Sequence, residues 1–273
     1  MNTPLTSDLI SCSFNNWYKN LNEFTLPSVL ISIPEEVTEF ILSDGIHDPP
    51  KFDSFFEYVD EAITRFRKKV FVRVNWMSLD DAFYVLPRSD GFCTSYEEIM
   101  ELLQTSEKFV ECIERNPISF GVAEKDSSWE GVSPVLILQP YIDIPEEDEF
   151  RLFVFDKICI GISSRNEKGK SKMSKLGDII RDIMSVTFKA LPMSCYVCDV
   201  IINDKKEWKI IDVSPFGGLT DPSPFTYDQL VKAAEEKKVL AKAGKREKRC
   251  SGFPIELQEG QSIVELLELL GDK

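Results

Sequence analysis

The chain has 273 residues, of which 43% are hydrophobic, so it is long enough for one large domain or two lobes around a sizeable core. Its formal net charge of -14 disfavours general nucleic-acid binding, because such a surface repels phosphate backbones. No apolar run reaches the roughly 18–20 residues that span a bilayer, and the amino terminus lacks the basic and apolar regions of a secretory signal. Seven cysteines, an odd number without framework spacing, suit reduced thiols, so we expect a cytoplasmic protein.

The single histidine, His47, lies in the turn-like segment IHDPP. A zinc site with three histidines is therefore excluded within one chain, and any serine–histidine–aspartate triad would need this one residue. We interpret His47 as an ordinary loop residue, and no catalytic residue is predicted.

In the first half of the chain, residues 11–46 predict an aromatic-rich segment, a short strand and a short helix. Two longer helices follow, with the strand KKVFVRVNW directly after the first of them. Each of these helices opens with a capping box: Ser54 with Glu57 for residues 54–69, and Ser95 with Glu98 for residues 95–115.

From residue 135 onward the pattern favours strands. The segment EFRLFVFDKICIGISSRN predicts a hairpin that turns at Asp156-Lys157, and both faces of its strands are apolar, so we expect layers on both sides. A helix near 176–190, a second hairpin, a helix from Tyr227 and a last helix SIVELLELL, capped by Ser262 and Glu265, complete the pattern. The chain is therefore predicted to be α+β, with helices packed on antiparallel sheets.

The segment KAAEEKKVLAKAGKREKR, residues 232–249, is basic in an otherwise acidic chain. A solvated helix or mobile connector is one interpretation of such a charge run, and a docking segment for an acidic partner is the other.

Two aspartates, Asp199 and Asp212, interrupt the apolar strands of the second hairpin. Aspartate is depleted in strands, and the burial of its charge costs several kcal/mol unless something compensates. A turn centred on Lys205-Lys206 places Asp199 opposite Asp212, with Cβ atoms about 5 Å apart. Side chains alternate along a strand, so Ser214 shares the face of Asp212.

Two facing carboxylates repel each other, and either a raised pKa of one of them or a divalent cation between them relieves the repulsion. Oxygen ligands of this kind suit Mg²⁺, which keeps several waters and completes its shell with substrate phosphates. Two other interpretations stay open. The hairpin could face solvent, or a one-residue slip in the turn would separate the pair.

Other strands carry matching polar residues. Arg73 and Asn75 interrupt VFVRVNW, Arg151 lies among apolar residues, and Arg165 follows a strand end. A guanidinium in an apolar strand needs an anionic partner, which phosphate oxygens or the two aspartates would supply. A buried arginine–aspartate pair without a ligand is the alternative. Together these residues indicate a nucleotide–magnesium cleft, although the chain has no Walker A lysine motif and no GxGxxG.

The chain resembles the cell division cycle protein 123 family in motifs that keep their order over about residues 11–230 and 250–270. These motifs are SFNNWY, VNWMSLDDAFYV, DEFRLFVFDKICIGISSRN, IIDVSPFGGLTDPSPFTYDQL and GFPIELQEGQSIVELLELL. The resemblance implies an ATP-grasp fold that holds nucleotide between two lobes. It also implies a cytosolic assembly chaperone of eukaryotic translation initiation factor two, which acts through the gamma subunit of that factor.

The resemblance further implies ATP and Mg²⁺ as ligands, with Arg151 and Arg165 at the phosphates and backbone groups of Gln139 and of Tyr141 or Ile142 at the adenine edge. The residues that would bind the nucleotide are Arg73, Asn75, Gln139, Tyr141, Ile142, Arg151, Arg165, Asp199 and Asp212, and those that would hold the metal are Asp199, Asp212 and Ser214.

Three positions depart from the family's pattern, which has lysine at Arg73, arginine at Gln139 and asparagine at Ser214. Each replacement is polar, so we expect nucleotide binding to survive with a changed affinity.

Four regions are expected: an N-terminal lobe (1–138), a C-terminal ATP-grasp lobe (139–230), a basic linker or helix (231–250) and a segment that packs back on the core (251–273). The favoured function is an ATP- and Mg-binding assembly chaperone that acts as a monomer on the gamma subunit, without nucleic-acid or membrane contact. An ATP-grasp carboxylate–amine ligase and a scaffold without nucleotide binding are the alternatives.

Overall fold

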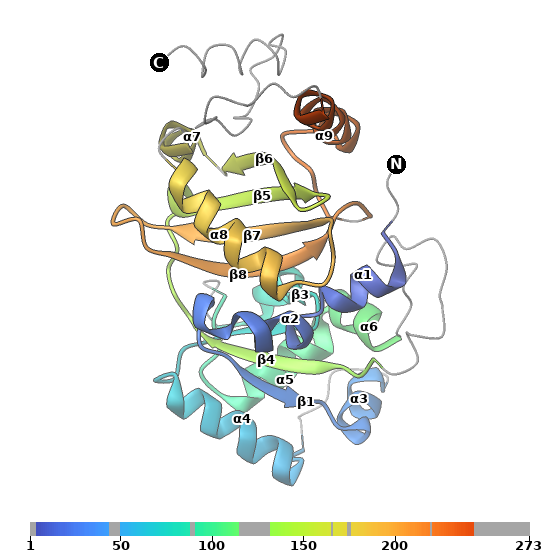
Figure 1. The fold of residues 1–273 in the computed structure, drawn as a ribbon. Helices are drawn as coiled ribbons and strands as arrows, with labels where there is room; N and C mark the ends of the chain where they lie inside the picture. The colour runs from blue at the N-terminus through green and yellow to red at the C-terminus, as the bar shows by residue number, and fades with distance from the viewer. Residues whose placement is uncertain are drawn as a thin grey trace.

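The computed structural model describes residues 4–43, 50–87, 91–114, 132–164, 166–173, 176–218 and 220–242. Its strands form two four-stranded antiparallel sheets, and each sheet makes one lobe together with its helices (Figure 1). Among these residues no helix is both long and apolar enough to cross a bilayer. The predictions for His47, Arg165 and the closing helix from Ser262 fall outside the described residues, as does the segment 251–273.

The N-terminal lobe is built on a sheet with the strand order β1-β4-β2-β3. Its strands are β1 (Val29–Ser32), β4 (Val135–Pro140), β2 (Val70–Val74) and β3 (Met77–Ser78). Its helices are α3 (Glu35–Leu42), α4 (Asp53–Arg65), the 3-10 helix η2 (Asp80–Val85), α5 (Tyr96–Thr105) and α6 (Glu107–Glu114). Leu136 and Leu138 of β4 pack into the core of this lobe, while Ile137 packs into the core shared with the other lobe. Residues 135–138 of β4 are all apolar because both faces of this strand are covered.

The two capping boxes predicted for this lobe differ in outcome. α5 begins after Ser95, whose side chain accepts a hydrogen bond from the N–H of Glu98, as predicted. α4 begins at Asp53 with Phe52 at the N-cap position and no side-chain hydrogen bond there, so the prediction for Ser54 is wrong.

The single helix predicted for residues 95–115 is two helices. Ser106 has an extended backbone with ψ 116°, which ends α5, and its hydroxyl accepts from the N–H of Phe109 at 3.2 Å, which caps α6. The same hydroxyl donates to Asp81 Oδ1 at 2.8 Å. A side chain from a distant turn therefore fixes the break.

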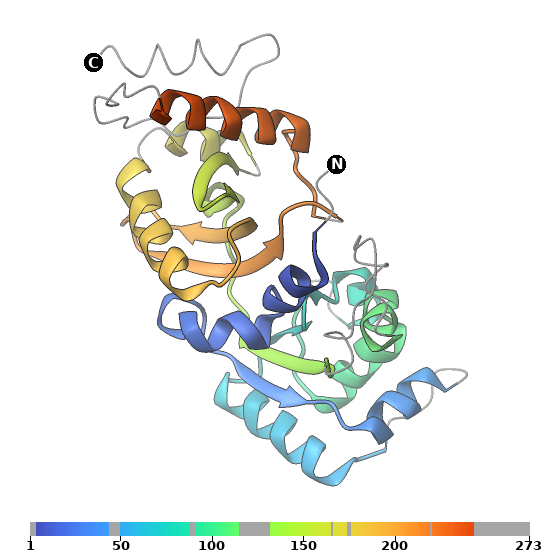
Figure 2. The same ribbon diagram turned by 45° about the vertical axis from the view of Figure 1, so that its right-hand side comes forward.

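The C-terminal lobe has the strand order β6-β5-β7-β8. Its strands are β5 (Glu149–Phe155), β6 (Ile158–Ser164), β7 (Tyr196–Ile202) and β8 (Trp208–Pro215), and its helices are η5 (Glu146–Asp148), α7 (Glu167–Met173), α8 (Gly177–Ala190) and α9 (Tyr227–Lys242). The hairpin turn at Asp156-Lys157 is confirmed, with φ 48° and 61° at these residues. α8 and α9 cover opposite faces of the sheet, as the apolar strands predicted (Figure 2).

The pairing of Asp199 with Asp212 across β7 and β8 is confirmed. The register near the hairpin turn differs from the predicted one. A register shift follows Asp199, so that Val200 pairs with Ile210 instead of Ile211. The hairpin turn is therefore offset by one residue, and Ile211 is the extra residue of a β-bulge that restores the expected pairing.

An N-terminal segment lies at the junction of the lobes and contains α1 (Thr6–Ser11), α2 (Phe14–Leu21) and the 3-10 helix η1 (Asn22–Phe24). α2 contacts α8 and β8 of the other lobe, and Figure 1 shows it between the two sheets. The expected lobe boundary at 138/139 falls within β4, all of which belongs to the N-terminal sheet.

Arg73 of β2 joins the two lobes directly. Its Nη2 donates to Asp212 Oδ1 at 2.6 Å and its Nη1 donates to the carbonyl of Ile211 at 2.9 Å. The guanidinium also lies 4.8 Å from the ring centroid of Phe14, a cation–π contact. The bulge residue Ile211 thus presents its carbonyl to the same arginine that pairs with Asp212.

Asn75, two residues after Arg73, joins the end of β2 to the start of β4 within the N-terminal lobe. Its side-chain amide donates to the carbonyl of Ser133 at 3.0 Å and accepts from the N–H of Val135 at 2.8 Å. Its own carbonyl accepts from the N–H of Phe14 at 2.6 Å. With 1% of its surface exposed, Asn75 ties the backbone of Ser133 and Val135 to β2 from a buried position.

We expect Arg73→Met to lower the free energy of unfolding by about 2–3 kcal/mol, because Asp212 loses its cation in a site that is largely shielded from water. Urea unfolding measures this. Arg181→Met, which breaks an exposed pair with Asp178 on α8, is the control and should change the free energy by less than about 0.5 kcal/mol. Equal losses for the two variants would contradict the role of Arg73 at the junction.

We expect Asn75→Ala to destabilise the fold by about 2–3 kcal/mol, since the buried side chain that bridges β2 to the backbone of Ser133 and Val135 is lost. The exposed Asn20, which donates to the carbonyl of Ala190 at 3.2 Å, provides a matched Asn20→Ala control with an effect below about 0.5 kcal/mol. Thermal and urea unfolding compare the two variants, and a loss at Asn75 no larger than the control would refute the assignment.

Candidate functional site

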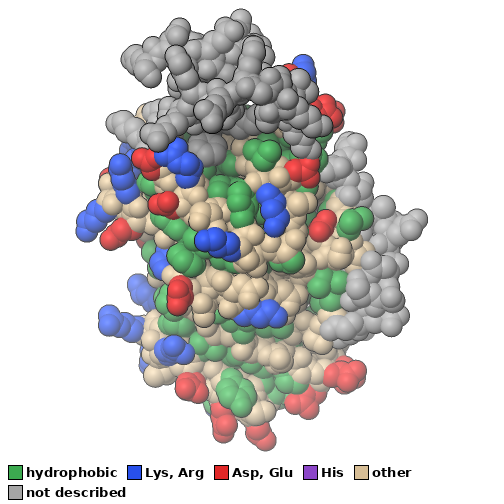
Figure 3. Space-filling view, in the orientation of Figure 1, with side chains coloured by type: hydrophobic (Ala, Val, Ile, Leu, Met, Phe, Trp, Pro, Cys, Tyr) green, Lys and Arg blue, Asp and Glu red, His purple; other side chains and the backbone are tan. Residues whose placement is uncertain are grey.

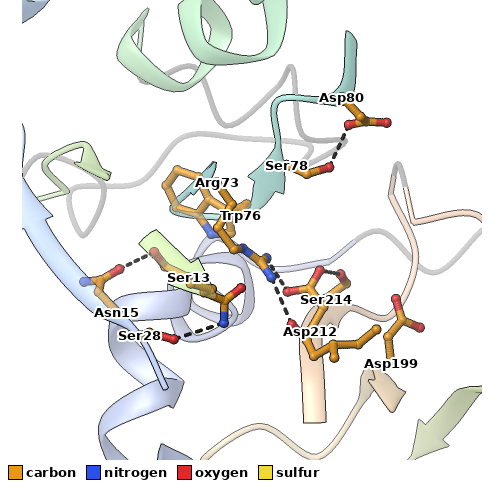
Figure 4. Close-up of polar contacts among 12 residues, drawn as sticks. Ser13, Asn15, Ser28, Arg73, Trp76, Ser78, Asp80, Asp199, Asp212 and Ser214 are labelled. Carbon is orange, nitrogen blue, oxygen red and sulfur yellow. Dashed lines mark hydrogen bonds and ion pairs between the residues drawn. The ribbon is translucent and has the colours of Figure 1, made fainter. Parts of the chain in front are cut away.

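A cavity of about 810 Å³ lies between the two lobes. Eight of the predicted site residues line it: Arg73, Gln139, Tyr141, Ile142, Arg151, Asp199, Asp212 and Ser214. Figure 4 shows Arg73 directed at Asp212, with Asp199 and Ser214 beside it. The two lobes therefore bring residues from five strands (β2, β4 with the residues after it, β5, β7 and β8) to one cleft.

The charged residues of the C-terminal sheet form one row across its strands. Arg151 of β5 pairs with Asp199 of β7, which in turn pairs with Asp212 of β8. Paired residues in antiparallel strands point to the same face of the sheet. This row lies on the face that α9 covers farther along, where Phe153 and Val197 begin the apolar core.

Arg151 holds Asp199. Arg151 Nε donates to Asp199 Oδ1 at 2.7 Å and Nη2 donates to Oδ2 at 2.8 Å, so the pair is bidentate. Arg151 Nη1 donates to the carbonyl of Asp221 at 2.9 Å. The hydrogen bonds with Asp199 raise the pKa of Arg151, although burial acts to lower it. This cation therefore stays charged at any physiological pH.

Asp212 has a different set of partners. Its Oδ1 accepts from Arg73, and its Oδ2 lies 3.4 Å from the hydroxyl of Ser214. Two arginines, one from each lobe, thus compensate the negative charges of the two aspartates. This is the arginine–aspartate arrangement that the sequence left open as an alternative to a ligand.

Carboxylates outnumber cations among the described residues that line the cavity. Six are acidic and three are basic: Asp80, Glu111, Glu149, Asp199, Asp212 and Asp221, against Arg73, Lys108 and Arg151. A free polyphosphate would be repelled by this lining, whereas a polyphosphate bound to divalent cations would not.

The donors fit a Mg²⁺ ion that arrives with phosphates. Asp212 Oδ2 and the hydroxyl of Ser214 are oxygen donors 3.4 Å apart, and Asp199 lies opposite Asp212 on the neighbouring strand. The described residues contain no cluster of three or more histidine, cysteine or acidic side chains that would bind a metal by themselves. Mg²⁺ does not need such a cage, because waters and phosphate oxygens fill the rest of its shell.

Apolar side chains also line the cavity. They are Leu26, Phe71, Pro140, Tyr141, Ile142, Ile144 and Ile211. The N–H of Tyr141 donates to the carbonyl of Lys69 at 3.0 Å, so this group is already used within the protein. The side chain of Gln139 donates to the hydroxyl of Ser28 at 3.0 Å. Apolar walls of this kind suit a nucleobase.

Two predicted site residues are not among this group. Asn75 does not line the cavity, and its amide is engaged with backbone groups of the N-terminal lobe. Arg165 lies outside the described residues.

Sequence reasoning missed the polar rim at β3 and α6. Lys108 Nζ donates to Asp80 Oδ1 at 2.6 Å, and the hydroxyl of Ser78 donates to the same oxygen at 2.7 Å. Burial alone would raise the pKa of Asp80, but the hydrogen bonds from Lys108 and Ser78 outweigh it and lower that pKa. The sequence carries only a weak signal for this rim, because Ser78, Asp80 and Lys108 are ordinary polar or charged residues near the ends of helices or strands.

The comparisons with known proteins agree with this fold. The D123 family model matches residues 47–250. A protein of Xenopus laevis named translation initiation factor eIF2 assembly protein is 27% identical over 263 residues, covering 81% of this chain and 77% of the relative. The protein of that name from Candida albicans is 27% identical over 277 residues, covering 83% and 79%.

Among solved structures, Cdc123 from Schizosaccharomyces pombe matches with a TM-score of 0.75 and 23% identity, covering 85% of this chain and 94% of that one. The expected α+β class is confirmed, with two antiparallel sheets and their helices. The family resemblance read from the motifs is confirmed as well, and the chain belongs to the D123 family.

Proposed function

We propose that this chain binds Mg-ATP between its lobes and acts as an assembly factor for eukaryotic translation initiation factor two. The observation that carries the nucleotide part is the pair of aspartates, Asp199 and Asp212, which meet across β7 and β8 inside a large cleft with an arginine on each side. The client part is supported by the relatives, which are named for the assembly of that factor.

In this proposal the cleft residues divide into three tasks. Asp199, Asp212 and the hydroxyl of Ser214 would hold Mg²⁺, and Arg151 would contact phosphates through the N–H groups that Asp199 and Asp221 leave free. The apolar walls would hold the base, with the N–H of Ile142 as the donor at the adenine edge in place of that of Tyr141. When bound, Mg²⁺ would neutralise charge on the phosphates and the carboxylates.

We expect calorimetry to detect binding of Mg-ATP, and Asp212→Asn to weaken it by at least about tenfold, since a metal ligand and the partner of Arg73 are lost together. Asp178→Asn, an exposed aspartate on α8, is the matched control and should bind as the wild type does within twofold. Thermal melting establishes that each variant is folded. An absence of heat for the wild type, or equal affinity of the Asp212 variant, would contradict the proposal.

We expect ATP to bind at least about tenfold more weakly when EDTA removes Mg²⁺, because the lining of the cavity carries more carboxylates than cations. The same titration with and without the chelator measures this. Metal-independent affinity would show that the two aspartates do not serve a cation.

The client would be the gamma subunit of the factor, contacted in the cytoplasm by a monomer of this chain. No disulfide joins any two of the six cysteines of the described residues, as suits a reducing compartment. On the face in Figure 3, acidic side chains gather at the end of the N-terminal lobe formed by α3 and α4. Exposed members of these helices are Glu35, Glu36, Glu39, Glu57, Asp60 and Glu61. Such a surface suits a basic face on a partner.

We expect the tagged chain to retain the purified gamma subunit in a pull-down with Mg-ATP present. The Asp212→Asn variant, assayed beside it, reports whether the interaction needs the nucleotide site. Absence of the gamma subunit both with and without Mg-ATP would remove the client part and leave nucleotide binding to its own test.

A further inference from the structure

One part of the cavity between the lobes is not used by the proposed nucleotide site. It lies where β3 and α6 meet the cavity, and we call it the β3–α6 rim. Its polar residues are Ser78, Asp80, Lys108 and Glu111, and its apolar residues are Leu9, Trp76 and Met77. None of these side chains has a task in the proposed binding of Mg-ATP.

The rim lies beyond Arg73, on the side away from the residues expected at the adenine base. Gln139 belongs to β4 on one side of β2, and Ser78 belongs to β3 on the other side, where it pairs with Arg73. Paired residues of antiparallel strands point to the same face of the sheet, so Ser78 shares the cleft-facing side of Arg73. Figure 4 shows Ser78 and Asp80 on the far side of Arg73 from Asp212. A nucleotide that extends from Gln139 to Asp212 therefore leaves the rim open.

The apolar part of the rim comes from the N-terminal segment and from the turn between β2 and β3. Leu9 of α1 packs with Trp76 and Met77 in a small cluster. The indole N–H of Trp76 donates to the carbonyl of Leu9 at 2.7 Å. Because this contact uses the polar atom of the half-buried indole, the ring offers apolar surface to a ligand. Among side chains, an indole ring is also the best aromatic partner for a cation.

The polar part of the rim carries an excess of negative charge. Asp80 Oδ1 accepts from Lys108 Nζ at 2.6 Å and from the hydroxyl of Ser78 at 2.7 Å. Glu111 lies one turn after Lys108 on α6 and is exposed. Two carboxylates therefore line the rim together with one ammonium group. A cation is attracted to such a lining, whereas an anion is repelled.

These features together select one class of ligand. A lysine or arginine side chain has a long aliphatic stem that packs on apolar and aromatic surface, and a cationic end that pairs with carboxylates. A divalent cation alone is a poorer occupant, because the described residues contain no group of three or more metal-binding side chains. The side chains of Lys108 and Asp80 are 38% and 54% exposed, so the rim is within reach of another protein.

We infer that the β3–α6 rim binds a lysine or arginine side chain of a protein client, held by Glu111 and Asp80 against Trp76. The source of this side chain rests on the proposed function, whereas the site can be tested without the client. The rim adjoins Arg73 and Asp212, so a nucleotide bound there lies beside the client side chain. Opposite charges at adjacent sites make each ligand strengthen the binding of the other.

The direct test is a titration of the full chain with Nα-acetyl-lysine methylamide, followed by the backbone amide signals in NMR. We expect shifts at Trp76, Asp80 and Glu111 with millimolar probe. The same probe with an acetylated Nε has no charge and should bind about fivefold more weakly. Equal binding of the two probes, or signals of the rim that do not move, would overturn the inference.

Variants of Glu111 isolate the contribution of its charge. Glu111→Gln should weaken binding of the lysine probe about threefold, as expected for an exposed ion pair, and Glu111→Lys should abolish it by repulsion. Glu107 is exposed on the same helix and does not line the cavity, so Glu107→Gln and Glu107→Lys are the matched controls and should bind as the wild type does. Thermal melting establishes that each variant is folded. Equal affinities of the Glu111 and Glu107 variants would refute the site.

Pull-downs of the purified gamma subunit with Mg-ATP separate this inference from the proposed function. Retention by the wild type and by Glu107→Lys, with loss in Glu111→Lys, supports both. Retention by Glu111→Lys at the wild-type level would overturn the inference and leave the proposed function standing. The reverse holds if Glu111→Lys abolishes probe binding in a chain that retains no gamma subunit and binds no Mg-ATP, because the rim then serves another client.

Discussion

The ion pair between Arg73 and Asp212 is the contact on which the cleft depends. The pair spans 2.6 Å between strands of different sheets, and the same guanidinium lies over the ring of Phe14 and donates to the carbonyl of Ile211. An arginine 95% buried keeps its charge only with such partners, since an uncompensated guanidinium would be expelled to water. The two lobes therefore meet where the N-terminal lobe supplies the guanidinium of Arg73 and the C-terminal lobe supplies the carboxylate of Asp212. The β-bulge at Ile211 places its carbonyl as a second acceptor for Arg73.

The facing aspartates set the electrostatics of the cleft. Arg73 and Arg151 neutralise them in this structure, yet the lining as a whole still carries more carboxylates than cations. Ligands that bring positive charge are favoured there, which is why a nucleotide with its metal is a better occupant than a bare polyphosphate. Two of the family departures also have protein partners: Gln139 bonds to Ser28, and Ser214 bonds to Asp212.

Arg151 belongs to a row of paired residues that crosses the C-terminal sheet from Asp212 on β8 to Ser163 on β6. The row itself follows from strand geometry, since paired residues of neighbouring antiparallel strands share a face. A sheet with such a polar row at one end and an apolar core under α9 at the other can hold ligands without losing its packing.

The sequence by itself determined the hairpins, continuous apolar strands such as β4, the cap at Ser95 and the facing of Asp199 and Asp212. Each of these features depends on residues close along the chain. Only the tertiary structure decided the break at Ser106, which needs Asp81 from another element, and the partner of Asp212, which comes from a strand 139 residues away. It also decided that Asn75 faces backbone groups rather than the cavity, and that Lys108 reaches the rim. Such contacts depend on how separate elements pack, and short-range pattern carries no information about that packing.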